Sequence, residues 1–374
     1  MDSSNLKIGI ESTMVPPIKT GMSMVKNYEK YGFDSLWFAD HIMSWIPEAI
    51  WTPEITTMAK FFRSPNDVYE VFTSMAITAC NTKKVYLGTG VTETFRRHPA
   101  VLAHIIMSLD HLSKGRVILG IGAGEKENVV PYGIKWEKPV TRLEESIRII
   151  KLLWENEKKV NFDGNFWKLK DAVLSIKPYK EQKSPPIWIA AHGQKMLELT
   201  GKLGDGWIPI YLNPKTYKEK LNVILKAAKA VGRHPDEITP SLCFNVIIDD
   251  KRDEVDKMLE TPIAKNHMLT LSHEHFKQYK ISHPLGDNFY GMLDYIPTRY
   301  DRETILNAIE KIPTAMCKDF YLNGTPEDVI SRIEEYIKLG LKHVILINTT
   351  PVCDFSKLST SLNALIKVLN YFKN

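Results

Sequence analysis

Short apolar runs alternate with longer amphipathic segments along the chain. Eight of the runs have the length of buried β-strands, and several end abruptly in polar or glycine residues. These predicted strands span residues 6–11, 34–39, 84–90, 115–122, 186–191, 205–210, 241–248 and 343–348. Amphipathic spacing and end signals between them predict helices near residues 20–31, 66–80, 99–112, 141–154, 302–312, 325–339 and 356–371.

Residues that favour helix ends support several of these boundaries. Gly32 suits the left-handed residue that closes a helix, and Pro99 suits the first turn of one. Thr325 can cap the helix that begins with Pro326. Asn66 can likewise cap the helix that runs to Cys80.

The alternation of strands and helices predicts parallel strands joined by right-handed crossovers. We therefore predict an α/β fold, a closed (β/α)8 TIM barrel formed by a single domain over residues 1–374. The alternative is a Rossmann-like domain with a cap, but the glycine-rich turn expected after its first strand is missing. Residues 43–65, 160–176 and 262–300 are predicted insertions, and the second of them reads as a hairpin around Asp163-Gly164.

Polar and glycine residues follow the predicted strands. In an α/β barrel, the carboxyl ends of all strands share one face, so these residues are expected to converge there. They are Glu11, Asp40-His41, Gly90-Val91-Thr92, Gly122 to Asn128, Ala191-His192-Gly193 and Asn348. Carboxylates, a histidine and two glycine-rich turns together suit a site that binds a phosphorylated cofactor and moves protons.

Composition narrows the classes of partner. The chain has 374 residues, 44% of them hydrophobic, and a net charge of +5 from 49 basic and 44 acidic side chains. No long Lys/Arg run stands out, so a nucleic acid partner is not expected. No apolar run approaches the roughly 18 residues of a membrane span, and no secretory pattern opens the chain, so we expect a cytoplasmic protein.

A metal centre is not predicted either. The four cysteines lie far apart and include no CxxC pair, which argues against a disulfide framework or a zinc site. His273, His275 and His283 lie near one another in sequence, but no cysteine or carboxylate pattern accompanies them. P-loop, GxSxG and HExxH motifs are missing as well.

Four groups of residues carry a family resemblance. They are Asp40-His41 with Trp45, Leu87-Gly-Thr-Gly-Val-Thr92 with Arg97-His98-Pro99-Ala100, Leu119-Gly-Ile-Gly-Ala-Gly-Glu125 with Asn128, and Ile189-Ala-Ala-His-Gly193 with Gly204-Asp-Gly-Trp207. In this order they resemble the bacterial-luciferase-like superfamily over nearly the whole chain, and its branch that uses the deazaflavin coenzyme F420 is the most similar. Pro131 to Pro139 and His283-Pro-Leu-Gly286 are similar to the phthiodiolone-type ketoreductases within that branch.

The resemblance implies where the cofactor lies. The deazaflavin ring would sit at the carboxyl face of the barrel, backed by a non-prolyl cis peptide at Gly90-Val91. Thr92, Asn128 and the Ala191-His192-Gly193 turn match positions that hold the ring edge and the phosphate tail. Asp40 and Gly124 belong to the same predicted cofactor-binding set.

The resemblance also implies catalytic roles. His41 would protonate or polarise the substrate oxygen, Glu125 would be a second acid or base, and Trp45 would orient the substrate. Glu11 matches a carboxylate on the first strand of the methylene-tetrahydromethanopterin reductases. The expected reaction is hydride transfer between coenzyme F420 and a carbonyl or alcohol carbon of a small molecule, in a homodimer.

Several alternatives stay open from sequence. A methylene-tetrahydromethanopterin reductase is favoured by Glu11 and disfavoured by the extra length at 262–300. A monooxygenase of the same superfamily would use FMN instead, and a fourth possibility is a cofactor-binding protein without turnover. The F420-dependent glucose-6-phosphate dehydrogenases are also similar, but Asp319 stands at the position of their sugar-phosphate-binding arginine, which argues against a phosphorylated sugar.

Overall fold

Eight parallel strands close into a barrel in the computed structural model, which describes residues 6–180 and 183–373. Around the barrel the order is β1, β2, β3, β4, β7, β8, β9 and β11, and pairing of β11 with β1 closes the ring. The strands are β1 (Lys7–Glu11), β2 (Ser35–Phe38), β3 (Tyr86–Thr89), β4 (Val117–Ile121), β7 (Ile187–Ile189), β8 (Gly206–Trp207), β9 (Thr239–Ile248) and β11 (His343–Asn348). The predicted TIM barrel and all eight of its predicted strands are confirmed.

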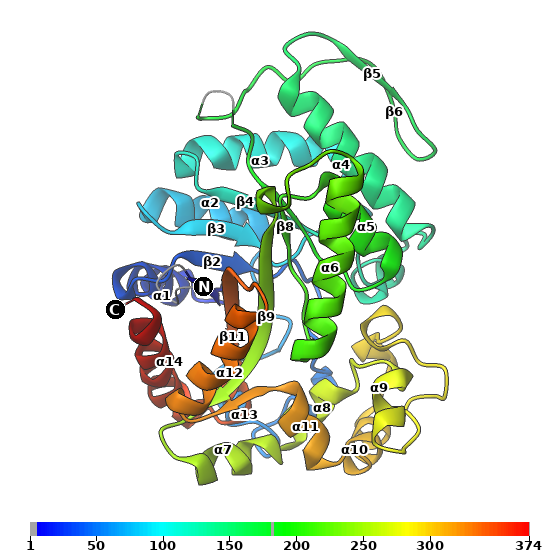
Figure 1. Cartoon of the computed structure of the whole chain (residues 1–374). Helices are drawn as coiled ribbons and strands as arrows, with labels where there is room; N and C mark the ends of the chain where they lie inside the picture. Colours follow the sequence, from blue (N-terminus) through cyan, green and yellow to red (C-terminus); the bar gives the residue numbers. More distant parts are fainter. Residues whose placement is uncertain (1–5, 181–182, 374) are drawn as a thin grey trace.

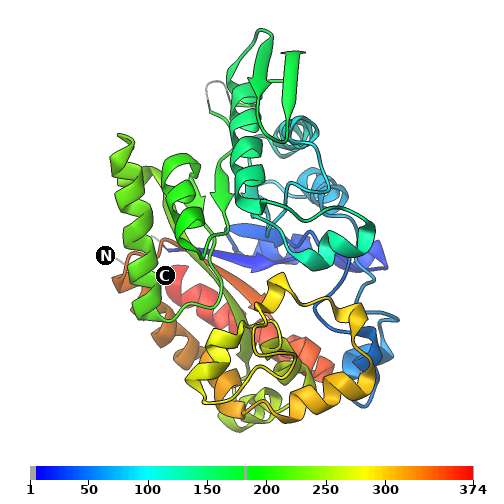
Figure 2. The same ribbon diagram turned by 90° about the vertical axis from the view of Figure 1, so that its right-hand side faces the viewer.

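Helices surround the barrel (Figures 1 and 2). They are α1 (Ile18–Tyr31), α2 (Val71–Asn81), α3 (Pro99–Ser113), α4 (Pro139–Glu155), α5 (Gln194–Leu203), α6 (Pro214–Ala230), α12 (Pro326–Lys338), α13 (Thr350–Cys353) and α14 (Leu358–Lys373). The predicted caps Gly32 and Thr325 are confirmed. The cap at Asn66 is wrong, because Glu70 caps α2 through the N–H of Thr73, and Asn66 instead accepts the N–H of Ser44.

The predicted hairpin is present as β5 (Val160–Asp163) and β6 (Lys168–Ala172). It extends away from the barrel at the top of both ribbon views (Figures 1 and 2). The buried carboxylate of Glu145 on α4 accepts the N–H groups of Asn165 and Phe166 and so fixes the hairpin loop.

The segment between β9 and α12 is more ordered than predicted. It contains α7 (Arg252–Leu259), α8 (Pro262–Met268), α9 (His273–Gln278), α10 (Arg302–Glu310), α11 (Thr314–Phe320) and the short strand β10 (Leu322–Gly324), which pairs with β9. These elements enclose a second apolar core that also takes in Ile46 and Ile50 from the loop after β2. Two of the predicted insertions, 43–65 and 262–300, therefore pack together.

Large aromatic side chains fill the barrel interior. The rings of Trp37 and Trp188 lie 5.3 Å apart, and Trp37 donates to Ser35. A Cβ atom on Gly9 or Gly88 would lie 2.7 Å or closer to the Trp37 ring, so only glycine leaves room for it. Because the interior is packed, ligands can reach only the ends of the barrel.

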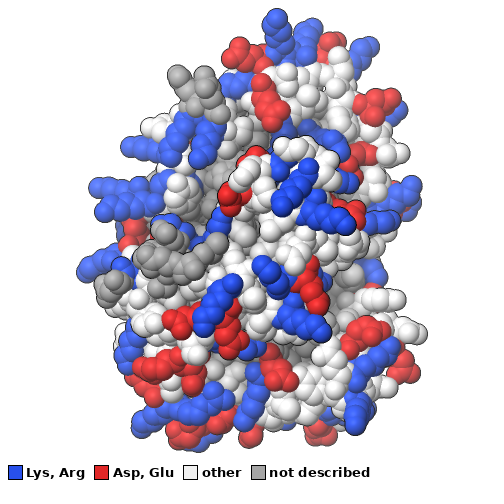
Figure 3. All heavy atoms as spheres, viewed as in Figure 1, with Lys and Arg blue, Asp and Glu red and all other residues white. Residues whose placement is uncertain are grey.

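The outer surface carries mixed charge. Figure 3 shows basic and acidic side chains interspersed over one face of the molecule. No helix within the described ranges has both the length and the apolarity needed to cross a membrane.

Arg116 immediately precedes β4 and binds the end of α2 and the loop that follows it. Its replacement by methionine tests how much these hydrogen bonds stabilise the barrel. Its buried guanidinium donates to the backbone carbonyls of Ala79, Thr82 and Val85. Arg116→Met leaves these acceptors unsatisfied, and we expect the free energy of unfolding to fall by about 3 kcal/mol. Urea denaturation measures it, with the exposed Arg148→Met as control, and equal stability of the two variants would contradict the expectation.

Candidate active site

His41 follows β2 and points into the mouth of the barrel, where it binds a carboxylate. Its Nδ1 atom lies 2.7 Å from Oε1 of Glu127, which is 2% exposed and sits in the 3-10 turn Lys126–Asn128 after β4. Asn128 closes the arrangement, because its Oδ1 accepts the N–H of Ile42 at 2.9 Å and its Nδ2 contacts the same pair. The loops after β2 and β4 are thereby held together.

The carboxylates around His41 determine its charge. Burial disfavours the imidazolium, but the hydrogen bond and charge of Glu127, with the charges of Glu125 and Asp40, raise the pKa of His41 to about 9. Burial raises the pKa of Glu125 to about 7, against the opposing effect of His41. Oε2 of Glu125 is buried and has no hydrogen-bond partner among the described residues. At neutral pH the site therefore holds a protonated histidine beside a carboxyl group near its midpoint.

The same three side chains, His41, Glu125 and Glu127, have ligand atoms within 4.8 Å of one another. This spacing could suit a divalent cation. Nδ1 of His41 already faces Glu127, however, so we interpret the set as an acid–base cluster.

Asp40 is the anchor of the loop after β2. It is 5% exposed and binds Arg97 at 2.6 Å, Arg96 at 2.9 Å and the hydroxyl of Thr92 at 2.6 Å. Burial opposes its ionisation, but the two guanidinium groups and Thr92 lower its pKa. Asp40 and Thr92 are both predicted to contact the cofactor. In the structure, their side-chain oxygens bind each other and the arginines.

The end of β3 forms a second wall of the mouth. The Gly90–Val91 peptide bond is cis, Gly90 is exposed and Val91 is partly exposed. Gly122 lies beside this wall, since a Cβ atom there would be 3.1 Å from the Val91 side chain. Gly124 has a φ of 89°, a conformation that favours glycine, and brings Glu125 round to His41.

The turn after β7 presents a helix N-terminus. Gly193 precedes α5, no side chain caps that helix, and His192 and Gly193 are exposed. Ala191 is buried and its carbonyl accepts Nε1 of Trp207, while Lys220 donates to the carbonyl of His192. Free N–H groups beside a lysine suit the phosphate that was predicted here.

Trp45 and Glu11 complete the predicted set. Trp45 stacks on His267 with ring centroids 4.0 Å apart and an angle of 15°. Glu11 ends β1 and accepts the N–H of Thr13. Burial raises the pKa of Glu11, against hydrogen bonds from Thr13 and the nearby charge of His41.

Sequence reasoning gave no role to Glu127, Arg96 or His267. The sequence contains a signal for Glu127, because this residue lies two positions after Glu125 in a turn already predicted at the carboxyl face of the barrel. It contains none for His267, because a histidine inside an irregular segment does not reveal which strand end it will face.

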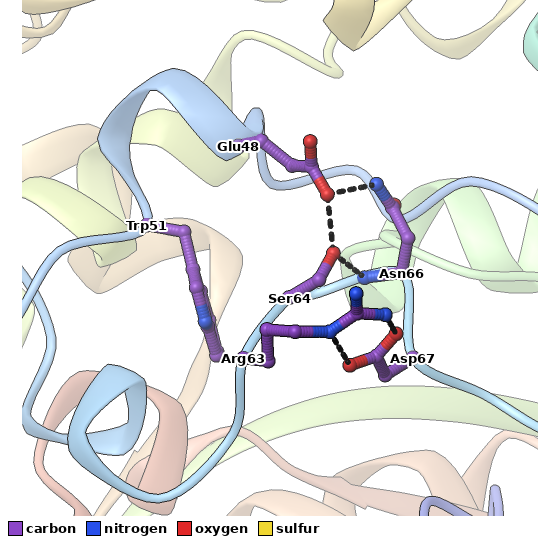
Figure 4. A pocket seen from close by; sticks show the side chains of 6 residues that line it. All are labelled: Glu48, Trp51, Arg63, Ser64, Asn66 and Asp67. Atoms are coloured by element: carbon purple, nitrogen blue, oxygen red, sulfur yellow. Dashed lines mark hydrogen bonds and ion pairs between the residues drawn. The ribbon is translucent and has the colours of Figure 1, made fainter.

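Two hollows adjoin the loop after β2. One of about 430 Å³ is lined by Asp40, His41, Ile42, Asn66, Val68, Glu70, Val71, Arg96 and Arg97. The other, of about 520 Å³, is drawn in Figure 4 and is lined by Glu48, Trp51, Arg63, Ser64, Asn66 and Asp67. There Arg63 pairs with Asp67, and Glu48 accepts from Ser64 and Asn66 (Figure 4). Asn66 lines both hollows, and His41 lines only the first.

Comparison with known proteins places this site in a family. The model of the luciferase-like monooxygenase family matches residues 6–343. The phthiodiolone/phenolphthiodiolone dimycocerosates ketoreductase of Mycobacterium tuberculosis (strain H37Rv) is 36% identical over 351 residues, which cover 92% of each chain. The 5,10-methylenetetrahydromethanopterin reductase of Archaeoglobus fulgidus is 31% identical over 352 residues, covering 91% of this chain and 92% of that protein.

Solved structures share the fold. An F420-dependent secondary alcohol dehydrogenase, in complex with an F420-acetone adduct, superposes with a TM-score of 0.77 at 21% identity and covers 100% of both chains. The coenzyme F420 dependent tetrahydromethanopterin reductase of Methanopyrus kandleri has a TM-score of 0.69 at 21% identity, covering 96% of this chain and 99% of that one.

Replacing Glu127 with glutamine tests the origin of the charge on His41. Glu127→Gln removes the charge at 2.7 Å, so we expect the pKa of His41 to fall well below its value of about 9. NMR titration of the ring measures this, with Glu125→Gln as a comparison expected to give a smaller fall. The raised pKa stabilises the fold below pH 6.5 and progressively less as pH rises through 9, so the variant should lose that dependence. An unchanged His41 titration would contradict the assignment.

Proposed function

The chain belongs to the luciferase-like monooxygenase family, and within it we propose an oxidoreductase that uses coenzyme F420 to interconvert a carbonyl compound and an alcohol. The observation that carries the proposal is the ion pair of His41 with the buried Glu127 at the mouth of the barrel. It supplies a cationic acid beside an open site, and such an acid can protonate the oxygen of a carbonyl that is being reduced. The ketoreductase relative and the two F420-dependent structural neighbours support it.

The geometry suits this cofactor in two places. The exposed Gly90 and partly exposed Val91 offer a flat backbone surface for a ring, without a large side chain on it. The start of α5, beside Lys220, suits the phosphate. When bound, coenzyme F420 supplies or accepts the hydride, and the protein has to position the substrate and handle one proton.

His41 handles that proton. Glu127 binds Nδ1, so the proton on Nε2 is the one that the protonated ring can give to a substrate. During reduction the carbonyl oxygen becomes negative and takes the proton from Nε2, which leaves a neutral imidazole still bound to Glu127. Glu125, whose pKa is about 7, can return a proton to His41, and alcohol oxidation reverses these steps.

A methylene-tetrahydromethanopterin reductase is the second candidate. Glu11 favours it, because this carboxylate lies close enough to His41 for their charges to interact. The relative from Archaeoglobus fulgidus supports it at 31% identity. An FMN-dependent monooxygenase remains the third candidate.

Other properties follow the same reasoning. By the resemblance, Asp319 stands at the position of the arginine that binds the sugar phosphate in the glucose-6-phosphate dehydrogenases. It is exposed and accepts the hydroxyl of Tyr279 at 2.5 Å, and a carboxylate at such a position would repel a phosphate. We therefore propose a small, unphosphorylated substrate. We expect a homodimer from the resemblance, and a cytoplasmic location from the sequence pattern.

A substrate panel separates the three candidates. The purified protein is titrated with F420 and with FMN, and then assayed by deazaflavin absorbance with ketones, secondary alcohols and methylene-tetrahydromethanopterin. We expect F420 binding and turnover of a ketone–alcohol pair. Turnover of the pterin alone would favour the second candidate, and retention of FMN without F420 binding would favour the third.

Replacing His41 with alanine tests its role in proton transfer. His41→Ala removes the acid, so kcat for ketone reduction should fall by about 10²- to 10⁴-fold while F420 affinity stays nearly unchanged. In the wild-type protein, ketone reduction should slow as pH rises through about 9, because His41 loses its proton. The exposed His104→Ala is the control. Equal loss of F420 affinity and kcat would mean that His41 acts by holding the site together.

A further inference from the structure

Tyr211 stands at the mouth of the barrel just beyond β8. Its neighbour Ile210 bridges to Cys243 on β9, and the φ angle of Tyr211 is 59°, a conformation that tyrosine rarely adopts. Its ring packs on Phe320 with centroids 4.1 Å apart, and the side chain stays partly exposed. Surrounding contacts therefore hold Tyr211 in an unfavourable backbone conformation, while its side chain stays partly exposed.

His267, on α8, lies within hydrogen-bond distance of the Tyr211 hydroxyl. It is 3% exposed, and its two ring nitrogens each face a tyrosine: Nε2 lies 3.0 Å from Tyr211 Oη and Nδ1 lies 2.9 Å from Tyr321 Oη. Burial lowers the pKa of His267 to about 3, so the ring is neutral and carries a single N–H. The hydrogen-bond network decides which nitrogen carries it.

Tyr321 fixes the tautomer. Its hydroxyl has two acceptors in reach, Nδ1 of His267 at 2.9 Å and the carbonyl of Ala264 at 3.4 Å. We assign the Tyr321 proton to the shorter of these two contacts, so that Tyr321 donates to Nδ1. His267 then carries its proton on Nε2 and donates it to Tyr211.

Asn245 supplies a second donor to the same oxygen. Thr349 donates to Oδ1 of Asn245 at 3.2 Å, which turns Nδ2 toward Tyr211 Oη at 3.4 Å. A hydroxyl oxygen accepts two hydrogen bonds and donates one. With both acceptor positions used by His267 and Asn245, the proton of Tyr211 can turn to the hydroxyl oxygen of Thr270, whose own proton goes to the carbonyl of His267, or to a ligand that takes its place.

We propose that Tyr211 is a second hydrogen-bond donor to the substrate oxygen, held in that role by His267. The proposal rests on the proposed function. Burial, with the charge of Glu125 nearby, raises the pKa of Tyr211, so its hydroxyl keeps its proton. As the electron pair of the C=O bond moves to oxygen, Tyr211 stabilises the developing charge, and His41 alone transfers a proton.

This assignment deepens the choice of substrate. A neutral donor aimed at the reacting centre fits an oxygen that becomes negative. The reacting carbon of a methylene-pterin carries nitrogen and no such oxygen. Tyr211 therefore favours ketones and secondary alcohols over the pterin. Trp45 lies on the loop that carries His41 and stacks on His267, so it links that loop to Tyr211 and its partners.

The test compares Tyr211→Phe with Tyr217→Phe, which removes a buried hydroxyl from α6 outside the barrel. With reduced F420 and acetone or 2-heptanone, Tyr211→Phe should lower kcat/KM by about 10²-fold and the control should not. Isotope-edited infrared spectra of the 13C-carbonyl ketone, bound with oxidised F420, should show the C=O stretch at higher frequency in Tyr211→Phe. The 15N NMR spectrum of the wild-type protein should show the His267 proton on Nε2.

Two results would overturn the assignment. One is a Tyr211→Phe variant that matches Tyr217→Phe in both kcat/KM and C=O frequency while wild type turns over the ketone. The other is a proton on Nδ1 of His267, which can be observed even if the variant does not fold. Failure of the proposed function looks different, because wild type itself would then neither bind F420 nor reduce any ketone, and the role of Tyr211 would fall with it.

Discussion

Asp40 follows β2 and carries a carboxylate that is almost fully buried, so its charge has to be balanced inside the protein. Arg96 and Arg97 provide the balance, and both come from the loop after β3. A buried ion pair of this kind contributes little net stability, but it tolerates only one arrangement of the two loops. Because His41 is the next residue, this constraint sets where the acid of the site stands.

Most charges of this network are paired. Asp40, Glu93 and Glu127 are matched by Arg96, Arg97 and the protonated His41, through contacts of 2.9 Å or less, and Arg97 also binds Glu70. Glu125 is left without a cation of its own, which agrees with its raised pKa and its unpartnered buried oxygen. Glu125 is thus the carboxyl group most easily protonated near neutral pH. It lies beside His41, which the proposed reaction would leave neutral.

The barrel could be predicted because each strand is a short apolar run with a clear end, as at Phe38 and Ile121. The strand ends also predicted that His41, Glu125 and Asn128 lie at one face, because the carboxyl ends of parallel barrel strands share one face. Asn66 misled because a residue that suits a helix cap also suits a loop hydrogen bond, and only the folded chain decides between them. The network around His267 could not be predicted, because it joins a histidine to tyrosines 56 and 54 positions away in sequence.

The division of labour within the chain follows from this contrast. The barrel strands and their first loops provide the proton and the surfaces suited to a cofactor, and they form one core. The segment between β9 and α12 forms a separate core that reaches the mouth through His267 and Phe320. Trp45 belongs to the loop that carries His41 yet packs with this second core, so it joins the two. Changes within the second core can therefore reshape the substrate side of the mouth while Asp40 and its arginines keep the acid in place.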